Sequence, residues 1–192
     1  MAVENISWDE ALQRLKEGNE RFVADKLDGK LQTSDRRAAL TGGQRPYAII
    51  LSCADSRVVP ELAYDTGLGE IFVIRVAGNI ANTSTIASIE YAVAHLGTNL
   101  IVVLGHESCG AVTAALDGGD AGYNLNHLLA HILPAKAASE DPSVNGVVKK
   151  NAELTSNALA ARSEIIGDAV DSGKLKIMPA YYNLGTGKVD YL

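Results

Sequence analysis

Four short segments of largely apolar residues constrain the fold of this chain most. They fall at residues 47–53, 70–75, 99–105 and 175–182. Strands whose side chains do not alternate between apolar and polar are covered on both faces, which is typical of parallel sheets. Helical spacing of apolar residues occupies the intervening sequence, at 83–96, 110–116, 126–138 and 144–172. The sequence therefore predicts an α/β fold with a mostly parallel central sheet of about four strands and helices on both of its faces.

The ends of the chain add an arm and an edge. Ser7 is a candidate N-cap for an amphipathic helix. Residues 183–192 read as a turn followed by a short alternating strand, which we expect at an antiparallel edge of the sheet.

The chain has the size of one domain. It has 192 residues and contains no repeat, low-complexity tract or linker. We expect a single domain over residues 1–192, with a helical arm and loop at 1–45 and an α/β core at 46–192.

Charge and hydropathy exclude two classes of partner. Lys and Arg number 17 against 23 for Asp and Glu, and no long basic stripe is present, so neither nucleic acid nor an anionic membrane is expected as a partner. The longest apolar stretches are far shorter than a membrane span. The opening MAVENISWDE lacks the basic and apolar regions of a secretory signal, which favours a cytoplasmic protein. A sequence that begins after a cleaved signal would look the same.

Both cysteines of the chain stand where predicted strands end. Cys53 closes the first strand, and Cys109 follows His106 in an H-x-x-C spacing after the third. Ligands of open α/β sheets bind at such carboxyl ends. Two thiolates and an imidazole suit a tetrahedral zinc ion whose fourth position stays open, as in catalytic sites, whereas the alternative is a pair of incidental core thiols. Asp55 could occupy or flank that fourth position, and Arg57 could hold Asp55 through a bidentate pair.

These motifs resemble one family along nearly the whole chain. CADSRV followed by GHESCG is similar to the β-class carbonic anhydrases, and LKEGNERF, VIRVAGNI, IEYAVAHLG and YYNLGTGKV resemble that family in the same order. The resemblance implies that Cys53, His106 and Cys109 are zinc ligands and that Asp55 with Arg57 is the catalytic dyad. It implies a zinc lyase that hydrates carbon dioxide reversibly to bicarbonate and a proton, by zinc-hydroxide attack.

The resemblance extends to substrate contacts and assembly. It implies that Gln44 hydrogen-bonds the substrate and that Phe72 and Tyr91 line a narrow apolar pocket, with Tyr91 supplied by a neighbouring subunit. The alternatives are a solvated loop amide for Gln44 and core packing for Phe72. The family is also expected to form a homodimer or homotetramer, with the N-terminal helix packed on a partner subunit. Glu107 follows a ligand directly, and we expect its side chain to point away from the metal.

One comparison with the family concerns regulation. In some members the active site closes at low pH, when the aspartate at the position of Asp55 becomes the fourth zinc ligand. Members that bind bicarbonate as an inhibitor do so with a tryptophan, an arginine and a tyrosine. The tryptophan stands at the position of Ile50 and the arginine at that of Arg75. The isoleucine has no indole N–H to offer. We therefore expect an open site near neutral pH, in which Asp55 is paired with Arg57.

Two rival functions remain at this point. Hydrolysis of carbonyl sulfide or carbon disulfide would use the same ligands, since those substrates are also small and apolar. A non-catalytic zinc-binding interaction protein is the second, although such a site would need neither Asp55 nor Arg57.

Overall fold

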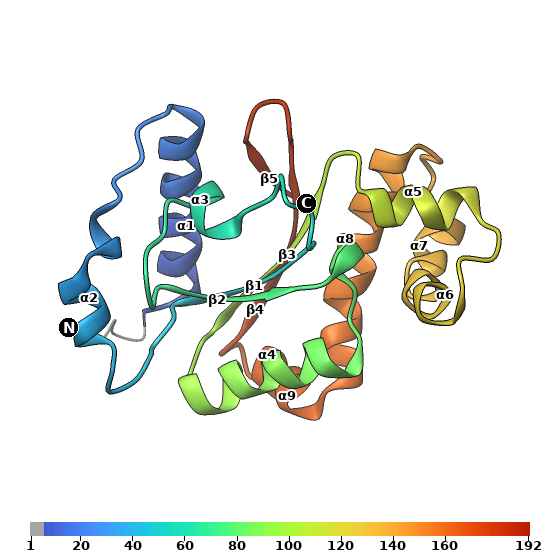
Figure 1. The fold of residues 1–192 in the computed structure, drawn as a ribbon. Helices are drawn as coiled ribbons and strands as arrows, with labels where there is room; N and C mark the ends of the chain where they lie inside the picture. Colours follow the sequence, from blue (N-terminus) through green and yellow to red (C-terminus); the bar gives the residue numbers. More distant parts are fainter. Residues whose placement is uncertain (1–5) are drawn as a thin grey trace.

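Five strands form one sheet in the order β2-β1-β3-β4-β5 in the computed structural model, which describes residues 6–192 (Figure 1). Their bounds are β1 (Ala48–Ser52), β2 (Ile71–Arg75), β3 (Leu100–His106), β4 (Lys176–Tyr182) and β5 (Val189–Tyr191). The first four strands are parallel, and β5 pairs antiparallel with β4. The predicted α/β sheet with an antiparallel edge strand is confirmed.

Helices occupy most of the remaining described chain. They are α1 (Trp8–Val23), α2 (Ser34–Ala39), α3 (Pro60–Ala63), α4 (Thr83–Leu96), α5 (Gly110–Asp117), α6 (Tyr123–Ala130), α7 (Leu133–Ala138), α8 (Val144–Arg162) and α9 (Glu164–Asp171), with short 3-10 turns at Lys30–Gln32 and Ala77–Asn79. Within residues 6–192, none of these helices combines the length and the apolar character needed to cross a membrane.

Two segments predicted as single helices are each divided in two. The helix expected over 144–172 is interrupted at Ser163, whose extended backbone ends α8 and whose hydroxyl accepts from the Ile166 amide as the cap of α9. The helix expected over 126–138 is interrupted between α6 and α7, where Pro134 stands in the first turn of the new helix. Proline is tolerated in that first turn because no intrahelical partner is lost there.

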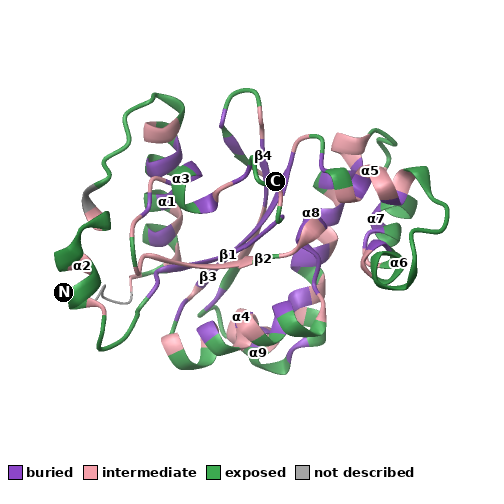
Figure 2. Ribbon diagram, viewed as in Figure 1, coloured by how far each residue is buried: buried purple, intermediate pink, exposed green. Residues whose placement is uncertain are grey.

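Both faces of the sheet are buried under helices (Figure 2). One face packs against α1 and α3, and the opposite face packs against α4, α8 and α9. A third cluster lies beyond the carboxyl ends of β1 and β3, under α5, α6, α7 and the first turns of α8, and it contains both cysteines. The carboxyl ends of β1 and β3 are therefore covered by a separate apolar cluster.

The N-terminal helix covers the sheet of its own chain. Ser7 caps α1 by accepting from the Glu10 amide, and Leu15 and Gly18 are buried on the helix's inner face. Buried Asn19 bonds three main-chain groups, one in α3, one in the turn before β5 and one at the first residue of β5. The inner face of α1 is therefore covered by its own chain, and the packing of this helix on a partner subunit stays a prediction.

Candidate metal centre

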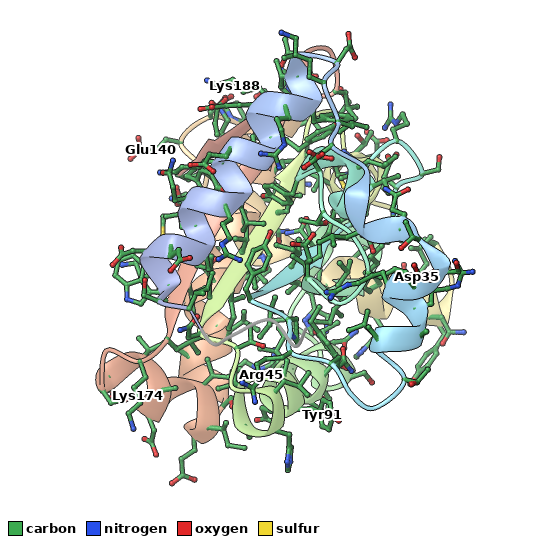
Figure 3. The ribbon with its side chains drawn as sticks, turned by 90° about the vertical axis from the view of Figure 1, so that its left-hand side faces the viewer. Asp35, Arg45, Tyr91, Glu140, Lys174 and Lys188 are labelled. Atoms are coloured by element: carbon green, nitrogen blue, oxygen red, sulfur yellow. The ribbon has the colours of Figure 1, made fainter. Side chains whose placement is uncertain are left out.

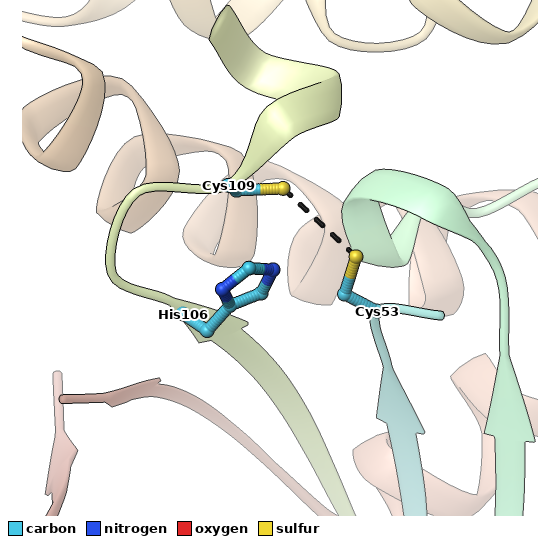
Figure 4. Close-up of side chains that lie close together, drawn as sticks. All are labelled: Cys53, His106 and Cys109. Atoms are coloured by element: carbon cyan, nitrogen blue, oxygen red, sulfur yellow. Dashed lines mark hydrogen bonds between the residues drawn. The ribbon is translucent and has the colours of Figure 1, made fainter. Parts of the chain in front are cut away.

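Two neighbouring strands and one helix bring the predicted ligands together. β1 pairs with β3 up to Ser52 and Leu104, so the residues that follow emerge at one edge of the sheet. Cys53 comes directly after β1, His106 is the last residue of β3, and Cys109 is the N-cap residue of α5. Figure 4 shows their side chains turned toward one another. All three are buried, with exposed fractions of 4%, 0% and 1%.

The spacing of the ligand atoms fits a tetrahedral ion. The two Sγ atoms are 3.9 Å apart, and the ligand atoms of all three residues lie within 4.8 Å of one another. A disulfide would need a separation of about 2.05 Å. Sulfurs bound at about 2.3 Å to a tetrahedral zinc stand about 3.8 Å from each other, close to the separation found.

The imidazole of His106 is held with one nitrogen free for an ion. Its Nδ1 lies 2.9 Å from the carbonyl oxygen of Glu107, to which it donates. That bond fixes the tautomer in which Nε2 carries a lone pair. Nε2 is buried and has no hydrogen-bond partner among residues 6–192. Buried polar atoms are rarely left unpaired, so this nitrogen is the atom that a metal would satisfy.

The two thiols ionise very differently without a cation. Hydrogen bonding from Cys109 lowers the pKa of Cys53 against the opposing effect of burial, and the Gly78 amide, 3.3 Å from Sγ, lowers it further. The same sulfur–sulfur hydrogen bond, with burial, raises the pKa of Cys109. A metal ion bound by both sulfurs would take the place of the proton that they share, since thiolates are the form that binds metals.

Asp55 and Arg57 form a bidentate pair at the rim of this cluster. Arg57 donates from Nε to Oδ1 at 2.9 Å and from Nη2 to Oδ2 at 2.7 Å. Its main-chain amide also donates to Oδ1. These bonds hold the pKa of Asp55 well below its usual value, so the group is a carboxylate. Oδ2 lies 3.8 Å from Nε2 of His106, which places the carboxylate beside the ligands while Arg57 retains it.

Arg75 has a structural part that the sequence did not reveal. It ends β2 and donates from Nε to the carbonyl of Cys53 at 3.0 Å and from Nη2 to the carbonyl of Asp55 at 2.7 Å. In the sequence, the only sign of this role is that Arg75 is a cationic residue at the carboxyl end of an otherwise apolar strand. Arg75 thereby fixes the backbone that carries both a ligand and the dyad.

The three predicted substrate residues do not reach this cluster within one chain. Gln44 is exposed in the loop before β1, and β1, about 17 Å long, separates that loop from Cys53. Phe72 pairs with Ile49 near the start of β1, and its ring lies 6.4 Å from that of half-exposed Tyr91 on α4. In Figure 3, Tyr91 and Arg45 lie at the end of the molecule opposite Lys188 of the β4–β5 turn. Substrate contacts by these residues would require a second subunit.

Comparison with known proteins decides the family. The carbonic anhydrase family model matches residues 48–189, a range that contains Cys53, Asp55, Arg57, His106 and Cys109. The fold matches a β-carbonic anhydrase from Coccomyxa, solved with acetazolamide, at a TM-score of 0.76 and 28% identity, over 94% of this chain and 86% of that one. This chain belongs to the β-carbonic anhydrases.

Relatives of known name agree with this assignment. Carbonic anhydrase 2 of Mycobacterium tuberculosis is 41% identical over 185 residues, covering 93% of this chain and 89% of the relative. The carbonic anhydrase of Mycolicibacterium smegmatis is 38% identical over 188 residues, 94% of this chain and 91% of the relative. A tetrameric β-carbonic anhydrase of Sordaria macrospora matches at a TM-score of 0.75 and 25% identity, over 95% of this chain and 97% of that one. The chain is therefore an enzyme, a β-carbonic anhydrase that hydrates carbon dioxide reversibly, and neither rival function is favoured.

Proposed function

We propose that this β-carbonic anhydrase binds one zinc ion through Cys53, His106 and Cys109 and hydrates carbon dioxide beside it, with Asp55 and Arg57 as the catalytic dyad. The observation that carries the proposal is the unpaired, buried Nε2 of His106 next to two sulfurs 3.9 Å apart. Two sulfurs and one nitrogen are donors that zinc prefers, and three protein ligands leave the fourth position for chemistry.

The dyad supplies orientation and a fixed negative charge. A zinc ion acidifies water and so provides the nucleophile near neutral pH. The Asp55 carboxylate, ionised because Arg57 pairs with it, accepts a hydrogen bond from the attacking water at Oδ2 and aims it. The three bonds from Arg57, two to Oδ1 and one to Oδ2, keep the carboxylate at the rim of the cluster. This arrangement supports the open site expected from the sequence.

Substrate contacts and assembly belong together in the proposal. Gln44, Phe72 and Tyr91 would complete the substrate pocket of a partner subunit in a homodimer or homotetramer. Partly buried apolar residues along β2, the strand at one edge of the sheet, support such an assembly, since exposed strand edges are usually covered. The Sordaria macrospora relative is described as tetrameric. Carbon dioxide and bicarbonate are the proposed ligands, and nucleic acid and membranes are not proposed as partners.

A reducing compartment suits these ligands. Two free thiols 3.9 Å apart would be open to oxidation outside the cell, where disulfides form and persist. We therefore place the enzyme in the cytoplasm.

Metal analysis tests the ligand set. The wild-type chain should carry about one zinc per chain, and Cys53→Ser should lose most of it because a serine hydroxyl stays protonated and binds zinc poorly. Ser84→Ala, an exposed change on α4, serves as the control. Full zinc occupancy in Cys53→Ser would contradict the assignment.

A further inference from the structure

Only two residues, Glu107 and Ser108, connect two of the proposed ligands. The chain must leave β3 at His106 and enter α5 at Cys109 within this loop. Ser108 has φ 52°, in the left-handed region that a residue with a Cβ adopts only with backbone strain. Such a conformation persists only where surrounding contacts enforce it, so the partners of this loop bear on where the ligands point.

Glu107 ties the loop to the β4–β5 turn through its side chain. Its Oε2 accepts from the Leu184 amide at 2.9 Å and from the Gly185 amide at 3.4 Å. Its own amide donates to the carbonyl of Tyr182, and its carbonyl accepts from Nδ1 of His106. The carboxylate points away from the ligands, as expected from the sequence. The group that orients the imidazole therefore belongs to a residue anchored at both its main chain and its carboxylate.

Asn145 holds the other half of the loop. It lies in the first turn of α8, and its Oδ1 accepts from the Ser108 amide at 2.9 Å. This bond satisfies the N–H of the residue with the left-handed backbone, directly before Cys109. A second bond, from Nη2 of Arg57 to the Ser108 carbonyl, is longer at 3.4 Å.

We propose that Glu107 and Asn145 are positioning residues that hold this loop in the shape in which His106 and Cys109 reach one metal ion. The inference rests on the proposed metal centre. Removing hydrogen-bond partners that orient metal ligands typically weakens metal binding by about 10–100-fold. The two residues come from different elements of the chain and grip different atoms of the loop, so their effects can be measured separately.

Release of the metal tests the proposal directly. Zinc-loaded Glu107→Ala and Asn145→Ala should transfer zinc to a chromogenic chelator about 10–100 times faster than the wild type. Their cobalt-substituted forms should show altered visible absorption, because the ligand geometry changes. The controls are Glu140→Ala and Asn157→Ala, both exposed, the second on the same helix as Asn145. Both controls should release zinc at the wild-type rate.

Conservative and compensating variants separate positioning from general destabilisation. Glu107→Gln and Asn145→Asp each keep an acceptor oxygen and should release zinc close to the wild-type rate. Ser108→Gly removes the cost of the left-handed backbone, so Asn145→Ala should lose less in that background than in the wild type. This pair carries the test if Glu107→Ala does not fold.

The results distinguish failure of the inference from failure of the metal centre. A wild-type chain that binds no zinc would overturn both. Normal zinc binding by the wild type, with unchanged release rates and cobalt spectra in the two alanine variants, would overturn the inference alone. Lower melting temperatures without a change in release or spectrum would overturn it as well.

Discussion

At the scale of single residues, the ionisation of Asp55 depends chiefly on its neighbour Arg57. Arg57 lowers the pKa of Asp55 from its model-peptide value of 3.8, so the ionised form is favoured in the folded chain. A lowered folded-state pKa adds stability that is present above the unfolded value and is lost as the pH falls through the folded value. The pair should therefore contribute fully at neutral pH, where Asp55 is needed as an acceptor.

Removal of the carboxylate should separate metal binding from turnover. Asp55→Ala should keep its zinc and lose carbon dioxide hydration by at least about 100-fold, because the nucleophile is no longer aimed. Stopped-flow hydration assays with metal analysis of the same samples would measure both. The exposed change Asp35→Ala is the control. Wild-type activity of Asp55→Ala at alkaline pH would show that the dyad has no such part.

The pH dependence of stability should reveal the pair as well. In the metal-free protein, the melting temperature of Arg57→Ala should lie below that of the wild type by a constant margin from pH 8 to about pH 5. The margin should narrow as the pH falls below about 4, because Asp55 of the unfolded chain then takes up a proton while Asp55 of the folded wild type, with its lowered pKa, does not. A margin that shrinks between pH 8 and pH 6 would assign the effect to another group.

Single residues also show how far the sequence reaches. The ligand cluster could be predicted because the chain has only two cysteines and both stand at strand ends. The hydrogen bond from the Ser108 amide to Asn145 could not be predicted, because 37 residues separate the two and no local sequence pattern marks the pairing.

The bounds of helices and strands agree with those predicted from local sequence where a segment is uniformly buried. They differ where contacts with distant residues determine where an element ends. Each predicted strand agrees with the structure to within one residue at either end, because continuous apolar runs leave little choice. The break between α8 and α9 escaped prediction because apolar spacing continues across Ser163. The Ser163 hydroxyl both caps α9 and donates to Glu90 of α4, a contact that local sequence does not encode.

Docking of α1 on its own chain leads to a prediction about stability. A Cβ added at Gly18 would stand 1.8 Å from the main-chain oxygen of Tyr64, which follows α3, so the helix would have to move. Gly18→Ala should lower the free energy of unfolding by about 1–3 kcal/mol or more. Gly42→Ala is the control, since a Cβ there meets nothing within 4 Å. Equal stability of the two variants in denaturant titrations would mean that α1 does not dock as described.

At the scale of the whole molecule, the proposed active site is divided. The proposed metal ligands and the dyad gather at the carboxyl ends of β1 and β3, while Gln44 lies in the loop before β1. Tyr91, on α4, lies with Arg45 at the end of the molecule opposite Lys188 (Figure 3). The sequence could assign these two residues to substrate only by resemblance, since a contact between chains leaves no periodic or local signal in one chain.

Mixing two defective variants tests whether sites are shared between subunits. Cys53→Ser lacks the metal but keeps Gln44, and Gln44→Ala has the opposite defect. After dissociation and random reassociation as dimers, about a quarter of all sites should have both features intact, and activity should rise accordingly. Activity no greater than the sum of the separate variants would place Gln44 outside the partner's site.

The most direct measurement of the central claim is stopped-flow hydration of carbon dioxide by the purified zinc-loaded chain. The geometry of Cys53, His106 and Cys109 predicts catalysis that disappears when a chelator removes the metal and returns with about one equivalent of zinc per chain. A folded chain with one zinc per chain that hydrates carbon dioxide no faster than buffer would contradict the account.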